Sequence, residues 1–282
     1  MSTYYSELSV PDRYHGYIQK FWTLNNIPNP FYTPVKYALP NGYCTIVFID
    51  GNGVSLKIED QLINLQAGIY LAGQMTRRVG ITLSPHTRAV MAQVKPWLPA
   101  LITNFPMKEL VNNVISLEYL NLKLYNRLLN VNQAAPEFVA AELYKNLQIY
   151  LQRNANTSLI QWAFNQLEKL PAQEQRVANL VLPSGYTQRR IEQKFKELVG
   201  PTAKEIQQIL QFRKLIDELD QFQSRGYLSA LAHRHGYYDQ SHFIRSYQRI
   251  MNEVPSLFDQ SGYILPASGH FGFLQSSQLA DL

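Results

Sequence analysis

Four polar residues near the C-terminal end of the chain have side chains that can contact the edges of nucleic-acid bases: Gln240, Ser241, His242 and Arg245. Arg forms bidentate hydrogen bonds with guanine and Gln with adenine, while Ser and His offer further donors and acceptors. Phe243, Tyr247 and Ile250 recur at i, i+4 and i+7, which predicts a helix with one buried face. The four polar residues then lie on the outward side of that helix, near its N-terminus.

A short helix and a tight turn are predicted to position this helix. Leu228, Leu231 and Ala232 give the short helix a narrow apolar stripe, and Gly236 can take a positive φ at its end. Asp239 stands where an N-cap residue belongs. The stretch from 231 to 255 therefore predicts a helix-turn-helix unit, whose second helix, here called the reading helix, places its N-terminal residues in the major groove.

The same spacing occurs a second time, upstream in the chain. Gly185 is preceded by an apolar pair and followed by Ile191 and Phe195 at the intervals found around Gly236, with one extra residue at the later turn. Asn252 stands where the upstream copy has Gly200, and Asn tolerates the left-handed conformation better than most residues. Duplication of the pattern predicts two helix-turn-helix units.

The outer face of the upstream reading helix carries four polar residues: Arg189, Arg190, Glu192 and Gln193. Arg suits guanine, and Glu can accept from the amino group of cytosine. Arg190 can instead contact only phosphate, and both sets of polar residues can be solvated helix faces with no partner. Between the units, Pro201 to about Gln223 reads as one helix of about 30 Å, close to the turn of B-DNA at about 34 Å.

At these residues the chain resembles the AraC/XylS family of bacterial transcription regulators. The resemblance covers about Thr157 to Gln260, and its most specific part is GYYDQSHFIRSY, residues 236–247. It implies two helix-turn-helix units joined by a long helix, behind a front domain that binds an effector or mediates dimerisation. Gln193, where the family often has Arg, and Ala203, where the second unit has Pro255, depart from the pattern and put the base contacts of the first unit in doubt.

The front of the chain has the alternation of β-strands. Residues 43–50 and 54–58 flank the turn Gly51-Asn52-Gly53 and predict a hairpin. Segments near 39–43, 69–73, 77–84 and 88–96 continue the pattern toward an antiparallel sheet or small barrel. From Trp97 the apolar period becomes helical. We expect an α+β chain: a β-rich regulatory domain (1–96), a helical linker or dimerisation region (97–156), an all-α DNA-binding domain (157–260) and a tail (261–282).

The front domain has two possible uses in this scheme, which the sequence leaves open. Five aromatic residues lie in the strand-rich region and either line a ligand pocket or, more commonly for such residues, form the core: Trp22, Tyr37, Tyr43, Phe48 and Tyr70. Alternatively, the chain dimerises through leucines of the helical region or through the helix that follows them. These are Leu122, Leu124, Leu128 and Leu129.

Composition and isolated residues argue against other classes of protein. The net charge of +5 and isoelectric point near 9.1 favour a polyanionic partner. The single cysteine, Cys44, allows no intrachain disulfide, and its place in a strand pattern indicates a buried hydrophobic residue. The sequence shows no signal peptide and no membrane helix, so we expect a cytoplasmic protein. The histidines do not form a metal-binding site. His15 and His86 are isolated, and the pair at 233 and 235 is predicted to lie on the surface. No enzyme activity, cofactor or metal is expected.

The sequence thus favours a sequence-specific transcription regulator, controlled by a small-molecule effector or by homodimerisation, that binds double-stranded DNA and, as an activator, RNA polymerase. Two alternatives remain. One is a protein-interaction module whose helix-turn-helix units no longer read DNA. The other is an enzyme fused to a DNA-binding domain, which a bound metal or a reactive Cys44 would favour.

Overall fold

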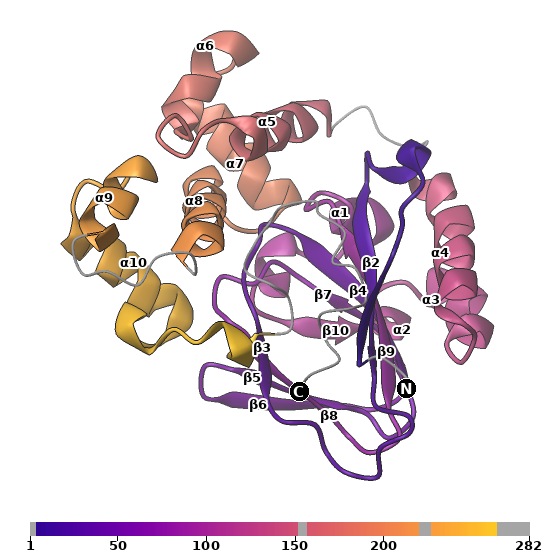
Figure 1. The fold of residues 1–282 in the computed structure, drawn as a ribbon. Helices are drawn as coiled ribbons and strands as arrows, with labels where there is room; N and C mark the ends of the chain where they lie inside the picture. The colour runs from indigo at the N-terminus through magenta and orange to yellow at the C-terminus, as the bar shows by residue number, and fades with distance from the viewer. Residues whose placement is uncertain (1–3, 152–156, 220–226, 264–282) are drawn as a thin grey trace.

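The computed structural model describes residues 4–151, 157–219 and 227–263, which form a β-rich part followed by a helical part (Figure 1). We call residues 4–151 the front domain and residues 157–263 the helical domain. This arrangement confirms the predicted α+β class. The tail beyond Tyr263 lies outside the described residues. Within them, none of the helices has the length and apolar character needed to cross a membrane.

The front domain contains two sheets in which all neighbouring strands are antiparallel. The six-stranded sheet has the order β1 (Tyr5–Leu8), β2 (Ile18–Asn25), β9 (Arg88–Val94), β4 (Cys44–Asp50), β7 (Gly68–Ala72), β10 (Val114–Ser116). The four-stranded sheet has the order β3 (Lys36–Ala38), β8 (Val79–Leu83), β5 (Val54–Ile58), β6 (Gln61–Leu65). A 3-10 turn, η1 (Asp12–Tyr14), connects β1 to β2.

The predicted hairpin around Gly51-Asn52-Gly53 is wrong, although both of its strands exist. β4 pairs with β7 and β9, whereas β5 pairs with β6 and β8 in the other sheet. The turn is a corner between the sheets: Gly51 has φ 102°, and a Cβ there would lie 2.1 Å from the carbonyl oxygen of His86. Alternation of apolar residues shows that each strand buries a face, but it does not show which strand is its partner.

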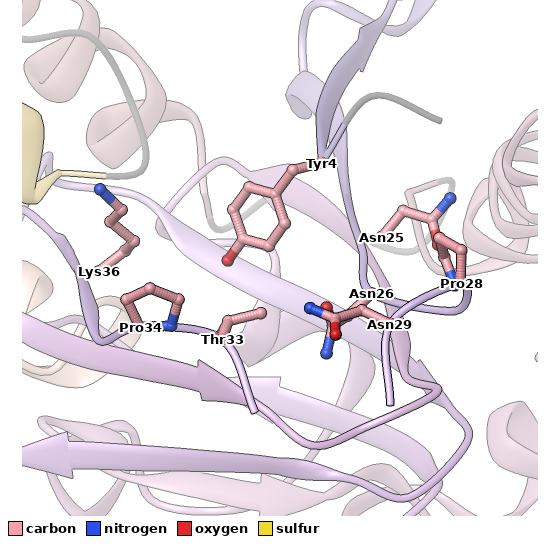
Figure 2. A pocket seen from close by; sticks show the side chains of 8 residues that line it. All are labelled: Tyr4, Asn25, Asn26, Pro28, Asn29, Thr33, Pro34 and Lys36. Carbon is pink, nitrogen blue, oxygen red and sulfur yellow. The ribbon is translucent and has the colours of Figure 1, made fainter. Parts of the chain in front are cut away.

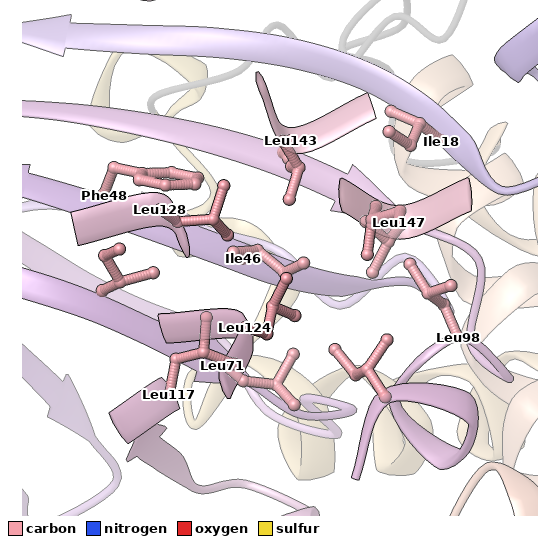
Figure 3. Close-up of a cluster of buried hydrophobic side chains, with 14 of the residues drawn as sticks. Ile18, Ile46, Phe48, Leu71, Leu98, Leu117, Leu124, Leu128, Leu143 and Leu147 are labelled. Carbon is pink, nitrogen blue, oxygen red and sulfur yellow. The ribbon is translucent and has the colours of Figure 1, made fainter. Parts of the chain in front are cut away.

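The helices that follow β9 complete the core of the front domain. They are α1 (Pro99–Ile102), η2 (Met107–Leu110), α2 (Leu117–Leu120), α3 (Leu122–Leu128), η3 (Leu129–Val131) and α4 (Pro136–Leu151). α3 and α4 lie against one face of the six-stranded sheet (Figure 3), where Leu124, Leu128 and Leu143 pack against strand residues such as Ile46. The second face of the sheet packs on the four-stranded sheet through residues that include Trp22.

This packing corrects the dimerisation hypothesis. Leu124 and Leu128 are fully buried inside the front domain, so neither is accessible to a second chain. Leu122 and Leu129 are exposed to 56% and 44%. Residues 97–151 therefore do not act as a free linker, because their apolar faces cover the sheet, and a strand from this stretch, β10, extends it.

The helical domain follows the predicted order. It contains α5 (Ser158–Lys169), η4 (Val177–Leu180), α6 (Val181–Ser184), α7 (Gln188–Leu198), α8 (Ala203–Leu219), α9 (Tyr227–Arg234), α10 (Gln240–Met251), η5 (Pro255–Leu257) and η6 (Gln260–Gly262). The long helix predicted from Pro201 to about Gln223 is α8, and the end of the predicted range lies outside the described residues.

α8 is shared by two small cores. Its first half contributes Ile206 and Ile209 to a cluster with Phe164 and Phe195, which belongs to the first unit. Its second half contributes residues such as Phe212 to a cluster with α9 and α10. Since both units pack on one continuous helix, α8 fixes the position of one reading helix relative to the other (Figure 1).

Candidate nucleic-acid interface

The second helix-turn-helix unit has the local structure predicted for it. Gly236 ends α9 with φ 75°, and the side chain of Asp239 accepts a hydrogen bond of 2.7 Å from the backbone N–H of His242. Asn252 ends α10 in the left-handed conformation, with φ 52°. The turn, the N-cap and the C-cap of the reading helix α10 are therefore confirmed.

The first unit repeats this arrangement. Gly185 ends α6 with φ 68°, and the side chain of Thr187 accepts from the backbone N–H of Arg190 at 3.3 Å. Gly200 follows α7 with φ 103°, the position that Asn252 occupies after α10. Duplication of caps and turns in the structure matches the duplication of spacing in the sequence.

The predicted contact residues of α10 lie in its first turns. Gln240, Ser241 and Arg245 are exposed. His242 is half-buried, and its Nδ1 faces the backbone N–H of Tyr238 at 3.4 Å. Because Nδ1 serves as an acceptor there, the hydrogen of the neutral ring lies on Nε2, which leaves a donor for a further partner.

The predicted contact residues of α7 do not all have the same surroundings. Arg189, Arg190 and Gln193 are exposed, and the guanidinium of Arg190 lies 3.4 Å from the side-chain oxygen of Gln193. Glu192 is half-buried, and its Oε2 accepts from the backbone N–H of Ala203 at 2.9 Å. Glu192 thus satisfies a free donor at the start of α8, and this carboxylate stabilises the joint between the two helices.

One of the two histidines that the sequence placed on the surface is buried. His233 is exposed, but His235 is only 4% exposed, and its Nε2 lies 3.2 Å from a carboxylate oxygen of Glu218. Burial lowers the pKa of His235 below its ordinary value. The prediction for His235 is wrong because α9 is short and turns its last residues toward α8, where Gln211 donates to the carbonyl of His235 at 2.6 Å.

Sequence reasoning missed the residues that join the front domain to α10. The backbone N–H of Arg78 donates to the carbonyl of Ile250 at 2.9 Å, and the guanidinium of Arg77 donates to the carbonyl of Arg249. The side chain of Arg78 also pairs with Glu253. Cations and donors at a helix C-terminus satisfy the last carbonyls and oppose the negative end of the helix dipole.

The first unit contacts the front domain as well. Lys95 at the end of β9 lies 3.3 Å from Glu168 of α5, and Tyr43 donates to the same carboxylate. Burial lowers the pKa of Lys95 to about 8, with repulsion from Lys169 in addition, and burial raises the pKa of Glu168. A Cβ on Gly200 would lie 2.5 Å from the carbonyl of Met107, so the end of α7 sits directly on η2.

A pocket of about 300 Å³ opens between β1, the end of β2 and the loop before β3 (Figure 2). Its lining includes Tyr4, Asn26, Thr33 and Lys36. None of the five aromatic residues considered above lines it. Trp22 and Phe48 lie instead in the two cores, which is the plainer of the two roles the sequence left open for them.

Groups suited to a reactive centre are scarce in the part of the chain that the structure describes. Cys44 is buried as predicted, and burial raises the pKa of its thiol to about 12, so the nucleophilic thiolate is disfavoured. The described residues contain no cluster of three or more His, Cys, Asp or Glu able to hold a metal ion.

Comparisons with known proteins give one partial family match and several structural ones. A family model described as a domain of unknown function, DUF6597, matches residues 12–116, and no curated protein matches the chain. The fold is similar to ToxT from Vibrio cholerae, with 11% identity, a TM-score of 0.46, and coverage of 84% of this chain and 96% of that chain. A ToxT structure described as bound to an unsaturated fatty acid has 10% identity, a TM-score of 0.43, and coverage of 84% and 92%.

The AraC-like transcriptional activator CuxR is also similar, with 10% identity, a TM-score of 0.30, and coverage of 72% of this chain and 82% of that chain. The family match spans the chain from η1 to β10 and so lies within the front domain.

Proposed function

We propose that this chain is a sequence-specific DNA-binding transcription regulator of the AraC/XylS type. One observation carries the proposal: two capped helix-turn-helix units, α6–α7 and α9–α10, pack on one helix, and each presents exposed polar residues in the first turns of its reading helix. N-terminal residues of a reading helix are those that reach base edges in the major groove.

We assign contacts with DNA to two groups of residues. In α10 they are Gln240, Ser241, His242 and Arg245, and in α7 they are Arg189, Arg190 and Gln193. Glu192 can contact DNA only if the hydrogen bond from the backbone N–H of Ala203 to its carboxylate breaks, so we assign Glu192 mainly a structural role. Arg189 and Arg245 are the strongest candidates for guanine, because a guanidinium offers two parallel donors to O6 and N7.

DNase footprinting of the full-length protein on a duplex obtained by in vitro selection tests this proposal. Two reading helices held by one α8 should protect two major-groove segments on one face of the duplex, with centres about ten base pairs apart. Protection of a single segment per chain would show that α7 does not read DNA. Absence of preference for the selected duplex over random duplex would overturn the proposal.

We propose further that the front domain regulates DNA binding through its contacts with both units. Arg77 and Arg78 hold the end of α10, and Lys95 and Tyr43 hold α5 next to α7. Suppose that a ligand binds the front domain in only one arrangement of these contacts, and that the two arrangements differ in affinity for DNA. Ligand binding then changes the affinity for DNA, because it shifts the population toward one arrangement. A second protomer can act in the same way.

The pocket of Figure 2 is the place where we propose that a small effector binds. Its lining combines the apolar surface of Tyr4 and two prolines with polar groups that include Lys36, which favours a small ligand with an apolar part and an acidic group. The ammonium of Lys36 donates to the carbonyl of Ser261, and an acidic group would share or replace that contact. Screening metabolites against the full chain should find a compound that raises its melting temperature and changes its affinity for the selected duplex. Lys36→Gln should weaken that response, while Lys57→Gln, an exposed change on β5, should not.

A further inference from the structure

A second, smaller cavity lies where the two helix-turn-helix units meet. It has a volume of about 160 Å³, and we call it the junction cavity. Arg176, just before η4, and Lys204, in the first turn of α8, belong to its lining on the side of the first unit. Gly236 and His242 belong to the second unit. The cavity thus joins the reading face of α10 to the start of α8, where α7 is attached through Glu192.

Most of the groups available at the junction cavity are hydrogen-bond donors; the exception is the side-chain oxygen of Gln175, a buried acceptor without a hydrogen-bond partner among the described residues. The side-chain oxygen of Gln207 accepts from the backbone N–H of Val177 at 3.1 Å, and that of Gln208 accepts from Arg249 at 3.0 Å. Each glutamine therefore keeps its NH₂ group for another partner. His242 likewise has its acceptor nitrogen facing a backbone N–H and its donor nitrogen available.

The charge at the junction cavity is positive. Arg176 and Lys204 are exposed, and within the described residues neither side chain has an ion-pair partner. The ten residues that line the cavity in the described part of the chain include no Asp or Glu. Two cations together with three neutral donors suit a group that is negatively charged and offers several acceptor oxygens.

We infer that the junction cavity binds a phosphate group of the DNA backbone that lies between the two major-groove segments. This inference rests on the proposed function. The volume admits a phosphate group and a few waters, since one water occupies about 30 Å³ in the liquid. His242 places the phosphate beside the base contacts of α10, and Lys204 places it beside α7. Such a contact fixes the register of both reading helices on the duplex without reading sequence.

The test compares full-length parent protein with the double variant Arg176→Gln/Lys204→Gln. Fluorescence anisotropy with the selected duplex and with random duplex, over a series of salt concentrations, gives the affinity and its salt dependence. Loss of one phosphate contact should reduce the slope of log K against log[salt] by about 1 and weaken binding to both duplexes by the same factor. Lys123→Gln combined with Lys57→Gln removes the same charge from exposed positions of the front domain and should leave the slope unchanged.

Three outcomes count against the inference. If the parent prefers no duplex, the proposed function fails and the inference with it. If the parent binds and the double variant behaves like the control pair, only the inference fails. The third outcome is that inorganic phosphate raises the melting temperature of the parent but not of the double variant, while the two proteins bind DNA equally well. In that case the cavity binds free phosphate and not a phosphate of the DNA backbone. Ethylation interference maps the phosphates whose modification weakens binding. The inference is supported if ethylation of a phosphate between the two protected segments weakens binding of the parent but not of the double variant.

Discussion

The backbone N–H of Arg78, at the end of the loop before β8, donates at 2.9 Å to the carbonyl of Ile250 in the last turn of α10. A residue of the front domain therefore closes the helix whose other end carries Gln240 and Ser241. The ion pair of Arg78 with Glu253 strengthens this contact, and both side chains are only 18% exposed. The pose of the second reading helix thus depends on the front domain.

The first prediction concerns this joint. Arg78→Ala should lower the free energy of unfolding by about 1–3 kcal/mol, because it leaves the half-buried carboxylate of Glu253 without its cation. Denaturant unfolding measures the change, and a cycle with Glu253→Gln isolates the pair. Lys57→Ala, at an exposed position of the neighbouring strand β5, is the control. If Arg78→Ala binds DNA with the same affinity as the parent, the front domain does not control DNA binding through this contact.

The second prediction separates stability from recognition in α10. Arg245→Ala should leave the melting temperature nearly unchanged, since exposed helix positions seldom cost more than about 0.5 kcal/mol, and should weaken binding to the selected duplex by about 1–3 kcal/mol. Phe243→Ala should destabilise the second unit by about 3–5 kcal/mol, because its ring is fully buried. Gln248→Ala, exposed near the end of the helix, should change neither quantity. Equal loss of affinity for random duplex would make Arg245 a phosphate contact.

The third prediction concerns the N-cap of α10. Asp239→Ala removes the acceptor for the N–H of His242 and should cost about 1 kcal/mol of stability. Asp239→Ser keeps an oxygen at that position and should restore most of the loss. Because His242 and its neighbours lie in the capped turn, the Ala variant should also bind the selected duplex more weakly. Thermal unfolding and anisotropy of the three proteins decide the matter; a Ser variant as weak as the Ala variant would rule out the capping role.

The fourth prediction uses the buried contact between Lys95 and Glu168. The pKa of Lys95 is lowered to about 8 by burial, with repulsion from Lys169 in addition. Between about pH 8 and the ordinary pKa of lysine, the unfolded chain binds more protons at this residue than the folded chain. Stability from this residue therefore rises with pH across that window.

Lys95→Met should remove this dependence. The free energy of unfolding of the parent should rise relative to that of the variant between pH 8 and about pH 10, by at most about 3 kcal/mol. The difference between the two proteins, measured by denaturant unfolding at each pH, cancels the titration of groups that they share. Parallel pH profiles would show that Lys95 titrates normally in the folded protein.

Local structure in the helical domain could be predicted from the sequence because its determinants are local. Gly185, Gly236 and Asn252 have the positive φ that their residue types favour, and Asp239 caps the helix that starts beside it. The candidate contact residues Gln240, Ser241 and Arg245 lie outward because helical periodicity alone places them opposite Phe243 and Tyr247.

The sequence by itself therefore determined the class of the fold, the two helix-turn-helix units, and the side chains on their outer faces. Tertiary structure alone decided the partners of β4 and β5, the burial of Leu124 and His235, and the use of Glu192 at the start of α8. It also decided that Arg78 closes α10 and that Arg176 and Lys204 share a cavity with His242. These relations join residues far apart in the chain. Periodicity shows that a residue is buried or exposed, but the residue it meets depends on how the whole chain packs.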